Sequence, residues 1–558
     1  MQTGSEIIAS SLEREGVKHV FTLPDGWIMP IYEELEKRGI KIISMRTEQA
    51  AASAADGYAR STRKLGVVAV AVGPGVANIM PSLAQAYLAG SPILALGGRT
   101  PFSNIDKMAF EEVNVHTWVE KYTKYSRLVL STCRLNEYLQ DASREALTGR
   151  MGPTLLEIPK DVSMGKCEKE IAYESPERYR PAGRIFGDPS AIERAKELIE
   201  RSERPVIVAG SGAYWSGACN EVVKLAEAAQ ALVATEGLAV GCIPTRHPLF
   251  GGNANVGIIT RYADLIIAIG ARFDEFLGFG RDESFYTEGT KVIHIDVDPS
   301  VIGKNKPVDV GIWGDAKAVT GQILESLSRN GKRMPTGSEW VSNASSLIKS
   351  YYNKMEEDAT SDETPIRPQR LMRDLREFAG ENGLFVLDGG DTTAWALVYL
   401  RAFRPGQIMW SHGPFGMIGT GIPMGIAAKL GNPERDVYVV TGDGSFLMSA
   451  VEIETAARYG IPIVVVVMND MLWGDVYHNR ILATGKKDSG RYALLERREY
   501  HEFARSLGGH GETVHDPTEI IGALKRAKDS GLPSVVDVRV SGEFNSPLSQ
   551  IQGFLKRD

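Results

Sequence analysis

Short apolar runs alternate with amphipathic stretches along almost the whole chain. The runs are rich in β-branched side chains and are often bounded by glycine, which is typical of strands buried on both faces of a parallel sheet. They comprise residues 67–72, 93–96, 206–209, 265–269, 292–295, 437–440 and 463–468. Helices between consecutive parallel strands imply right-handed crossover connections. The pattern therefore predicts an α/β protein with doubly wound parallel sheets.

Changes in polarity divide this pattern into three blocks, residues 1–175, 189–335 and 365–540. Residues 175–188 are polar and proline-rich, which predicts a first linker. Residues 338–368 are charged and lack strand-like runs, which predicts a helix followed by a second linker. A chain of 558 residues suits about three domains. Residues 541–558 lose the α/β rhythm, so we expect a tail that is either a lid or a frayed end.

The composition is ordinary for a globular protein, with 43% hydrophobic and 24% charged residues. A net charge of −7 argues against a broad nucleic-acid-binding surface. No stretch approaches the roughly 18 apolar residues of a membrane span, and the N-terminus does not look like a signal peptide. The widely spaced cysteines, without a metal-binding spacing, are expected to be buried thiols in a reducing compartment; they are Cys133, Cys167, Cys219 and Cys242. These features predict a cytoplasmic protein without nucleic-acid or membrane partners.

A glycine-rich turn with an acidic residue follows the strand predicted at residues 437–440. The turn is Gly442-Asp443-Gly444, and a helix is predicted to start near Ser445. Glycines let the backbone approach a phosphate, and free N–H groups at a helix start can bind it. The next strand of this block ends at Asn469-Asp470. Because Mg²⁺ takes oxygen ligands in octahedral geometry, the two aspartates suit a magnesium ion that bridges phosphates.

Residues 441–480 as a whole resemble the thiamine-diphosphate signature of the decarboxylase and acetolactate synthase superfamily. That signature ends in two asparagines, whereas here the second is Asp470. The resemblance implies that Mg²⁺ takes Asp443, Asp470 and the Leu472 carbonyl, and that Gly442, Gly444 and Ser445 contact the diphosphate. An aspartate keeps the oxygen ligand but adds a charge, which can change the metal affinity. The alternative is an ordinary turn of a Rossmann-type fold.

A second part of the signature lies near the N-terminus. Glu48 follows the strand expected at residues 41–44 and opens a helix that carries Gly57-Tyr58-Ala59-Arg60. Together with residues 73–78, which end at Asn78, this order resembles the catalytic glutamate and the "GYAR" helix of the superfamily. The resemblance implies that Glu48 hydrogen-bonds N1′ of the aminopyrimidine, so that the 4′-imino group takes the proton from thiazolium C2. A glutamate at a helix start is otherwise most often a solvated charge.

The third block contributes the other expected cofactor contacts. Residues 412–423 resemble the segment below the thiazolium ring, which implies that the Gly416 carbonyl accepts from the 4′-amino group. Ile418 matches the apolar wedge that bends the cofactor, although a plain core role is the alternative. Asp391 and Thr392 are expected to flank the diphosphate, or to cap a helix. In such folds Glu48 of one subunit meets the diphosphate site of its neighbour, so the resemblance implies a homodimer or homotetramer.

The middle block has features that suit a nucleotide. Gly210-Ser211-Gly212 and Gly270-Ala271-Arg272 follow predicted strands, and Asp296 ends another. Phosphates near the glycines and ribose hydroxyls on Asp296 would fit a dinucleotide-binding fold. Relatives in the superfamily bind FAD or ADP here, or nothing; CoA is a further possibility, and purely structural glycines are the alternative. The resemblance thus implies two thiamine-diphosphate-binding domains flanking a nucleotide-type central domain.

The motifs that separate the subfamilies point in two directions. Phe110-Glu111-Glu112 resembles oxalyl-CoA decarboxylases, and Asp388-Gly389-Gly390-Asp391-Thr392 resembles 2-hydroxyacyl-CoA lyases. Trp473-Gly474 and Leu495-Glu496 resemble benzaldehyde lyase. By contrast, residues 158–162 and 270–274 resemble acetolactate synthase.

The expected activity is a thiamine-diphosphate- and Mg²⁺-dependent lyase or carboligase that cleaves or forms 2-hydroxyacyl-CoA from formyl-CoA and an aldehyde or ketone. Glu111 and Glu496 are the expected proton-transfer groups, although Glu496 lies in a charged run typical of solvated residues. The residues expected to line the substrate pocket, or simply to pack, are Gly26, Trp27, Trp473 and Tyr477. The first alternative is an acetolactate synthase-type enzyme acting on pyruvate. The second is a non-catalytic regulatory relative, which the presence of Glu48 and Asp443 disfavours.

Overall fold

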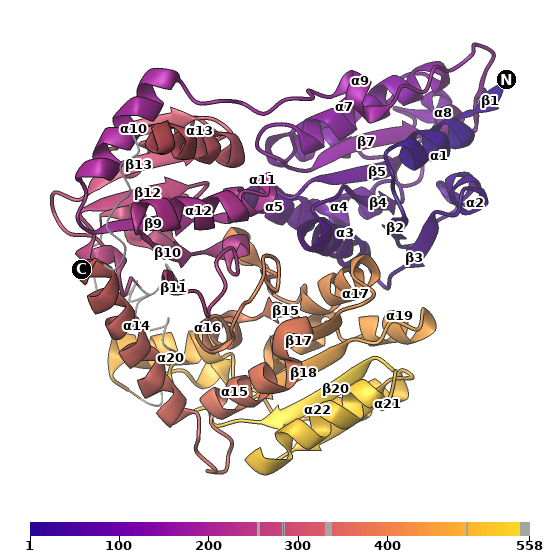
Figure 1. The fold of residues 1–558 in the computed structure, drawn as a ribbon. Coiled ribbons are helices and arrows are strands. Elements are labelled where there is room, and N and C mark those ends of the chain that lie inside the picture. Colours follow the sequence, from indigo (N-terminus) through magenta and orange to yellow (C-terminus); the bar gives the residue numbers. More distant parts are fainter. Residues whose placement is uncertain (254–256, 282, 284, 330–337, 487–488, 547–558) are drawn as a thin grey trace.

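The computed structural model describes residues 1–253, 257–281, 283, 285–329, 338–486 and 489–546. In this part of the chain, three six-stranded sheets are each covered by helices, and all their strand pairs are parallel (Figure 1). The predicted α/β class is confirmed. The apolar runs form strands such as β4, β9 and β12, in which every residue is buried, because helices cover both faces of each sheet.

The N-terminal sheet has the strand order β3-β2-β4-β5-β7-β6. Its strands are β2 (His19–Thr22), β3 (Lys41–Ser44), β4 (Gly66–Val70), β5 (Ile93–Arg99), β6 (Tyr125–Leu128) and β7 (Thr154–Pro159). The main helices are α1 (Gly4–Arg14), α2 (Met29–Lys37), α3 (Glu48–Thr62), α4 (Pro74–Asn78), α5 (Met80–Ala89) and α7 (Leu135–Leu147). A separate antiparallel pair joins β1 (Gln2–Thr3) to β8 (Lys166–Cys167).

The C-terminal sheet repeats this topology, with the order β16-β15-β17-β18-β20-β19. Its strands are β15 (Gly383–Asp388), β16 (Ile408–Trp410), β17 (Asp436–Gly442), β18 (Val464–Asn469), β19 (His510–Val514) and β20 (Ser534–Arg539). Its helices include α15 (Pro368–Ala379), α16 (Gly390–Tyr399), α17 (Gly421–Gly431), α18 (Asp443–Ser449), α19 (Glu452–Arg458), α20 (Gly474–Thr484), α21 (Tyr500–Ser506) and α22 (Ile520–Asp529). Numbered within each sheet, both terminal sheets read 2-1-3-4-6-5, which is the relation expected of two copies of one unit.

The central sheet has a different order, β11-β10-β9-β12-β13-β14. Its strands are β9 (Pro205–Ala209), β10 (Leu232–Thr235), β11 (Phe250–Asn253), β12 (Leu265–Ile269), β13 (Lys291–Asp296) and β14 (Val310–Trp313). Its helices include α10 (Pro189–Arg201), α11 (Ser211–Ser216), α12 (Cys219–Ala229) and α13 (Ala316–Arg329). Numbered within the sheet, the order is 3-2-1-4-5-6, that of dinucleotide-binding folds, and it reverses between β9 and β12.

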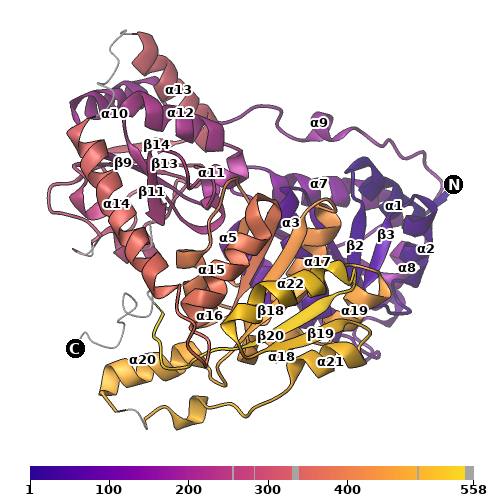
Figure 2. The same cartoon turned by 60° about the horizontal axis from the view of Figure 1, so that its bottom comes forward.

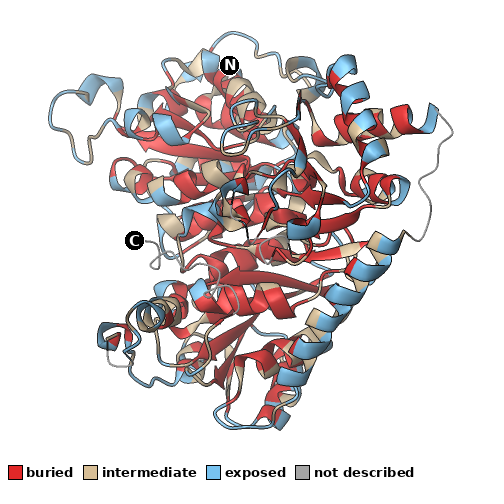
Figure 3. Ribbon diagram, turned by 90° about the vertical axis from the view of Figure 1, so that its left-hand side faces the viewer, coloured by how far each residue is buried: buried red, intermediate tan, exposed pale blue. Residues whose placement is uncertain are grey.

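Helix α3 of the N-terminal part and helix α17 of the C-terminal part pack against each other near the middle of the molecule (Figure 2). The approach is close because a Cβ added at Gly57 would lie 2.6 Å from the Met424 Cα. Buried residues of both helices belong to one apolar core that continues from the first sheet into the third. On the outside, α14 (Glu339–Asp358) runs past the central and C-terminal parts with one face exposed (Figure 3).

The cysteines depart from the expectation of free thiols. Cys133 bonds to Cys167, and Cys219 bonds to Cys242. The pairs are separated by 34 and 23 residues in sequence, but the fold brings their Cα atoms to 5.1 and 4.6 Å. Linear spacing could not show this, because each pair joins different elements of the fold. Within the described residues, none of the helices has the length and apolar character needed to cross a membrane.

Candidate active site

Glu48 is the first residue of α3, and the Thr47 side chain caps this helix by accepting from the Ala50 N–H at 3.1 Å. Asn78, at the end of α4, donates from Nδ2 to Glu48 Oε2 at 3.1 Å. The two helices follow β3 and β4, whose carboxyl ends lie at the same edge of the sheet. The structure thus brings together two predicted site residues that lie 30 positions apart. The half-buried Glu48 carboxylate is oriented by Asn78 and keeps a second oxygen for a ligand.

The segment predicted to lie below the thiazolium ring is next to the start of α3. Gln49 Nε2 lies 3.5 Å from Met417 Sδ of the same chain. Gly416 has a φ of 77° and is exposed, while Ile418 is half-buried. The left-handed backbone conformation of Gly416 favours glycine at this position, just before α17 begins. Gly416 and Ile418 therefore present an open apolar surface rather than a packed core.

Arg60 holds this segment from the other end of α3. Its fully buried guanidinium pairs with Asp56, at 2.7 Å from Nε to Oδ1 and 2.5 Å from Nη2 to Oδ2. Nη1 donates to the carbonyls of Trp410 (2.8 Å) and Ser411 (2.9 Å). The helix that begins at Glu48 is thereby fixed to the backbone that leads to Gly416. Sequence reasoning noted Arg60 only as part of a motif, because these contacts span about 350 residues.

The glycine-aspartate turn ends β17 as predicted, although α18 begins at Asp443 rather than at Ser445. Asp443 is buried, its Oδ1 accepts from the Gly444 N–H at 3.0 Å, and its Oδ2 has no hydrogen-bond partner among the described residues. Burial raises the pKa of Asp443 to about 7. Burial, and then the charge of Asp443, raises the pKa of Asp470 well above its usual range. Met471 has a φ of 61°, and the Leu472 N–H donates to Asp470 Oδ1 at 3.1 Å.

These residues fit a divalent cation bound to a diphosphate. Two carboxylates that raise each other's cost of ionisation are unfavourable without a compensating cation, and the charge of Asp443 acts on Asp470 in this way. The Asp443 oxygen that lacks a partner is the kind of donor that such an ion takes. The turns around it pack closely, since a Cβ added at Gly442 would lie 3.0 Å from Thr392 Oγ1, and one at Gly444 would lie 2.7 Å from the Trp473 ring. A side chain at position 444 would therefore collide with the Trp473 ring, and position 442 has little room for one.

Asp391 takes part in a buried network that the sequence did not reveal. It pairs with His478 Nδ1, and the His478 Nε2–H donates to the Gly542 carbonyl at 2.9 Å. Burial opposes the charge on His478, but the Asp391 hydrogen bond and charge raise the pKa of His478 overall. Ser546 Oγ also donates to Asp391 Oδ1 at 3.0 Å. The described start of the predicted tail therefore lies against Asp391, whereas residues 547–558, on which the lid prediction rests, are outside the described residues.

Glu111 lies close to the Glu48 side of the site. Its φ is 63°, and a Cβ added at Gly73, just before α4, would lie 2.5 Å from the Glu111 carbonyl oxygen. Oε2 is buried without a hydrogen-bond partner among the described residues. Loss of solvation, and then the charge of Asp25, raises the pKa of Glu111. A carboxyl group whose pKa is raised holds its proton more readily than an ordinary glutamate, which suits proton transfer.

The other residues predicted to contact the substrate do not form one cluster with Glu48 and Glu111. Glu496 is 81% exposed and pairs with Arg498 at 2.5 Å, as the solvated-charge alternative predicts. Trp473 packs on Gly444, and Tyr477 packs on Gly490. Gly26 is exposed with open space around it, and Trp27 is half-buried beside Lys160. Of this set, Trp473 is the one that contacts the glycine-aspartate turn.

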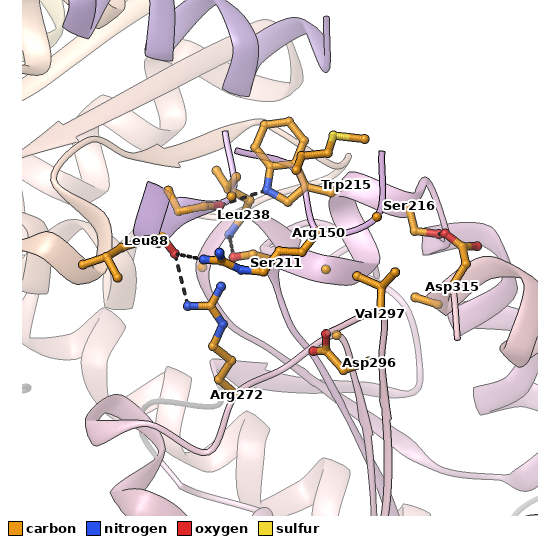
Figure 4. A pocket seen from close by; sticks show the side chains of 18 of the residues that line it. Leu88, Arg150, Ser211, Trp215, Ser216, Leu238, Arg272, Asp296, Val297 and Asp315 are labelled. Carbon is orange, nitrogen blue, oxygen red and sulfur yellow. Dashed lines mark hydrogen bonds between the residues drawn. The ribbon is translucent and has the colours of Figure 1, made fainter. Parts of the chain in front are cut away.

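A cavity of about 410 Å³ lies where the three sheets meet (Figure 4). Arg150 and Arg272 converge on the Leu88 carbonyl, and Asp296 faces them across the cavity. Gly210 does not line it; a Cβ added there would lie 2.4 Å from the Gly270 carbonyl oxygen and from Glu236 Oε1. Gly210 is therefore small because protein packs against it, not because a phosphate approaches. Arg150 was missed, since no motif distinguishes it.

Comparisons with known proteins agree with this arrangement. The pattern described as "Thiamine pyrophosphate enzyme, N-terminal TPP binding domain" matches residues 2–118, the central-domain pattern matches residues 192–323, and the C-terminal TPP-binding pattern matches residues 388–538. The chain is 34% identical to a "Probable acetolactate synthase large subunit" of Methanocaldococcus jannaschii, over 98% of this chain and 93% of that protein. It is 32% identical to an "Acetolactate synthase" of Arthrospira platensis, over 97% and 94% of the two chains.

The family patterns cover all three sheets, and the relatives match over nearly the whole length. They favour the acetolactate synthase alternative over the expected 2-hydroxyacyl-CoA lyase. The non-catalytic alternative is also disfavoured, because both carboxylates required of the enzyme are present. The chain therefore belongs to the thiamine pyrophosphate enzyme family and is a thiamine-diphosphate-dependent enzyme.

Proposed function

We propose that the protein is an acetolactate synthase-type carboligase that joins two 2-oxo acids, with pyruvate as the donor. The main support for this proposal is the similarity of nearly the whole chain to proteins named acetolactate synthase. The same fold contains Glu48, oriented by Asn78, and the turn that carries Asp443. Thiamine diphosphate, when bound, would supply an acidic carbon that can serve as the nucleophile toward the donor carbonyl.

The residues of the chain have separate tasks in this proposal. Glu48 would hold a proton at N1′ of the aminopyrimidine, and Asn78 keeps the carboxylate in place. The Gly416 carbonyl would accept from the 4′-amino group, and Ile418 would support the thiazolium ring. Glu111 transfers a proton to the substrate oxygen, which its raised pKa favours. Asp443, Asp470 and the Leu472 carbonyl would hold Mg²⁺, the ion that neutralises the diphosphate.

We also propose that the active unit is at least a homodimer. Phe415 and Gly416 are exposed beside the site, and α18 exposes Leu447 and Met448 next to the Asp443 turn. Contiguous exposed apolar side chains of this kind are typical of protein interfaces. A second copy would exclude water from a surface that a single chain leaves open.

The central cavity is proposed to hold a nucleotide. Arg150 and Arg272 would face its anionic groups, and Asp296 would accept from its ribose hydroxyls. FAD, ADP and CoA share this chemistry. Native mass spectrometry of the purified protein with each compound would identify the ligand, and the absence of binding to all three would contradict this part of the proposal.

The proposed reaction is tested by incubating the protein with thiamine diphosphate, Mg²⁺ and pyruvate, and by measuring carbon dioxide and acetolactate. We expect both products in equal amounts. Cleavage of 2-hydroxyacyl-CoA esters without acetolactate formation would instead support the CoA-lyase function and would contradict the proposal.

A further inference from the structure

Lys160 lies at the edge of the N-terminal sheet. Lys160 begins α8 (Lys160–Met164) directly after β7 and is half-buried. Its ammonium group lies 5.0 Å from the centroid of the Trp27 ring. Among the residues that the structure describes, Lys160 forms no ion pair. The ring face supports the cation and restricts its position without neutralising its charge.

The carboxylates near Lys160 already have other partners. Asp161 Oδ2 accepts from the Phe102 backbone N–H at 3.0 Å. Asp25 Oδ1 accepts from the Trp27 backbone N–H at 2.7 Å. Both hydrogen bonds hold loops in place, and among the described residues neither carboxylate forms an ion pair with Lys160. The charge of Lys160 is therefore available to an anion that arrives from outside the chain.

This cation belongs to the same sheet edge as Glu48. Trp27 follows β2, Glu111 follows β5 and Lys160 follows β7, and the carboxyl ends of these parallel strands lie at one edge. These groups are also linked by contacts. The charge of Asp25, which is close to Trp27, raises the pKa of Glu111. The Glu111 backbone packs on Gly73, which precedes the helix that ends at Asn78. One edge thus carries the activating carboxylate, a proton-transfer candidate and an unpaired cation.

We propose that Lys160 is a specificity-determining residue that binds the carboxylate of the acceptor 2-oxo acid, with Trp27 holding the ammonium group in position; this inference rests on the proposed function. The acceptor is favoured over the donor for a chemical reason. The donor carboxylate leaves as carbon dioxide, and a fixed cation would stabilise a charge that has to disappear. The acceptor carboxylate persists unchanged into the product.

In the balanced reaction, the donor carboxylate is lost and the acceptor carboxylate is retained. The donor loses carbon dioxide, and its carbonyl carbon bonds to the carbonyl carbon of the acceptor. The acceptor carbonyl oxygen takes up one proton and becomes a tertiary hydroxyl. Two 2-oxo acid anions and one proton give one 2-hydroxy-3-oxo acid anion and carbon dioxide. Only the acceptor needs a cation that stays in place throughout.

The test replaces Lys160 by methionine in the full-length protein and compares two acceptors with pyruvate as donor, using thiamine diphosphate and Mg²⁺. For 2-oxobutanoate, which carries a carboxylate, we expect kcat/KM to fall by about tenfold to a hundredfold, since a charged hydrogen bond is lost. For acetaldehyde, which carries none, we expect less than about a twofold change. Lys160→Arg should restore part of the loss, and Lys166→Met, an exposed lysine of the same part, is the control.

A binding measurement does not depend on turnover. Calorimetric titration with oxamate, an unreactive carboxylate, should show weaker binding to Lys160→Met than to wild type, with no binding of neutral oxamide to either. Equal losses for both acceptors, or unchanged oxamate binding, would overturn the role of Lys160 while the proposed function stands. A wild-type protein that is active on 2-hydroxyacyl-CoA esters but not on pyruvate would overturn the proposed function itself.

Discussion

Asn78 restricts the orientation of Glu48, the proposed activating group. A carboxylate that opens a helix can rotate freely, but the hydrogen bond from Asn78 Nδ2 fixes one oxygen of Glu48. Because the carboxylate is planar, this hydrogen bond also limits the positions that the second oxygen, Oε1, can take. Catalytic groups need this kind of support, because a side chain held by a neighbouring residue keeps the geometry that proton transfer requires.

His412 gives a prediction about acid stability. It is buried, its Nε2 accepts from the Trp410 Nε1–H at 2.6 Å, and burial lowers its pKa to about 4 from 6.5. The unfolded chain therefore binds a proton at His412 over pH 4 to 6.5, while the folded chain does not. Stability from this group is complete above pH 6.5 and is lost as the pH falls, by at most about 1.4 kcal/mol per pH unit.

Urea unfolding of the cofactor-free protein between pH 4.5 and 7.5 checks this expectation. His412→Gln keeps an acceptor for Trp410 but does not titrate, so the free energy of unfolding should decline less steeply with acid than in wild type. Parallel curves for the two proteins would show that His412 does not resist protonation.

Motif resemblance was enough to select Glu48, Asn78 and Asp443 as candidate site residues, because each lies within a short sequence pattern. It did not reveal what Lys160 and His478 contact, although Lys160 lies within the motif at residues 158–162. Their importance comes from partners far away in the chain, such as Trp27 for Lys160 and Asp391 for His478. A single lysine or histidine carries no local pattern that could reveal such contacts.

At the scale of elements, strands were predictable because their apolar runs have no polar interruption, and parallel sheets bury them on both faces. The order of the strands was not predictable from those runs. Long-range pairing decides it, and the central order 3-2-1-4-5-6 differs from that of the terminal sheets although the local patterns are alike. The role of Gly210 was misjudged for the same reason, since Gly270 and Glu236 come from other strand ends.

Gly270 tests how the turns of the central sheet are packed. Its φ is 58°, and an added Cβ would lie 2.6 Å from both the Ala213 N and the Gly212 Cα. Gly289 also has a positive φ, 85°, but it has open space around it. Gly289→Ala should therefore cost about 1 kcal/mol from the backbone alone. Gly270→Ala should cost roughly 1–3 kcal/mol more, because the turns have to move apart.

Thermal unfolding of the two glycine variants would measure this difference. The melting temperature should fall clearly further for Gly270→Ala than for Gly289→Ala. Equal decreases would mean that the turns around Gly270 are not tightly packed.

At the scale of the whole molecule, an exposed apolar patch lies beside the Asp443 turn of the C-terminal sheet. Leu447, Met448 and Val451 are 53%, 54% and 43% exposed beside the Asp443 turn. We expect this patch to be covered by a second copy. Met448→Glu should then convert the protein to monomers at micromolar concentration, because a charge would be buried in the interface.

Sedimentation velocity tests the assembly. The matched control is Leu347→Glu, which changes a 40% exposed leucine on α14 and should leave the dimer intact. A wild-type monomer that turns over pyruvate would contradict the expected dimer, as would a Met448→Glu protein that still dimerises.

The role of Glu48 is tested most directly with the variant Glu48→Gln. Acetolactate formation from pyruvate measures its activity, and calorimetry measures its binding of thiamine diphosphate. We predict that turnover falls by at least about a hundredfold, the scale of general acid–base catalysis, while cofactor affinity and melting temperature stay close to wild type. Glu36→Gln, on α2, should behave as wild type. If Glu48→Gln bound the cofactor and still formed acetolactate at the wild-type rate, Glu48 could not be the activating group.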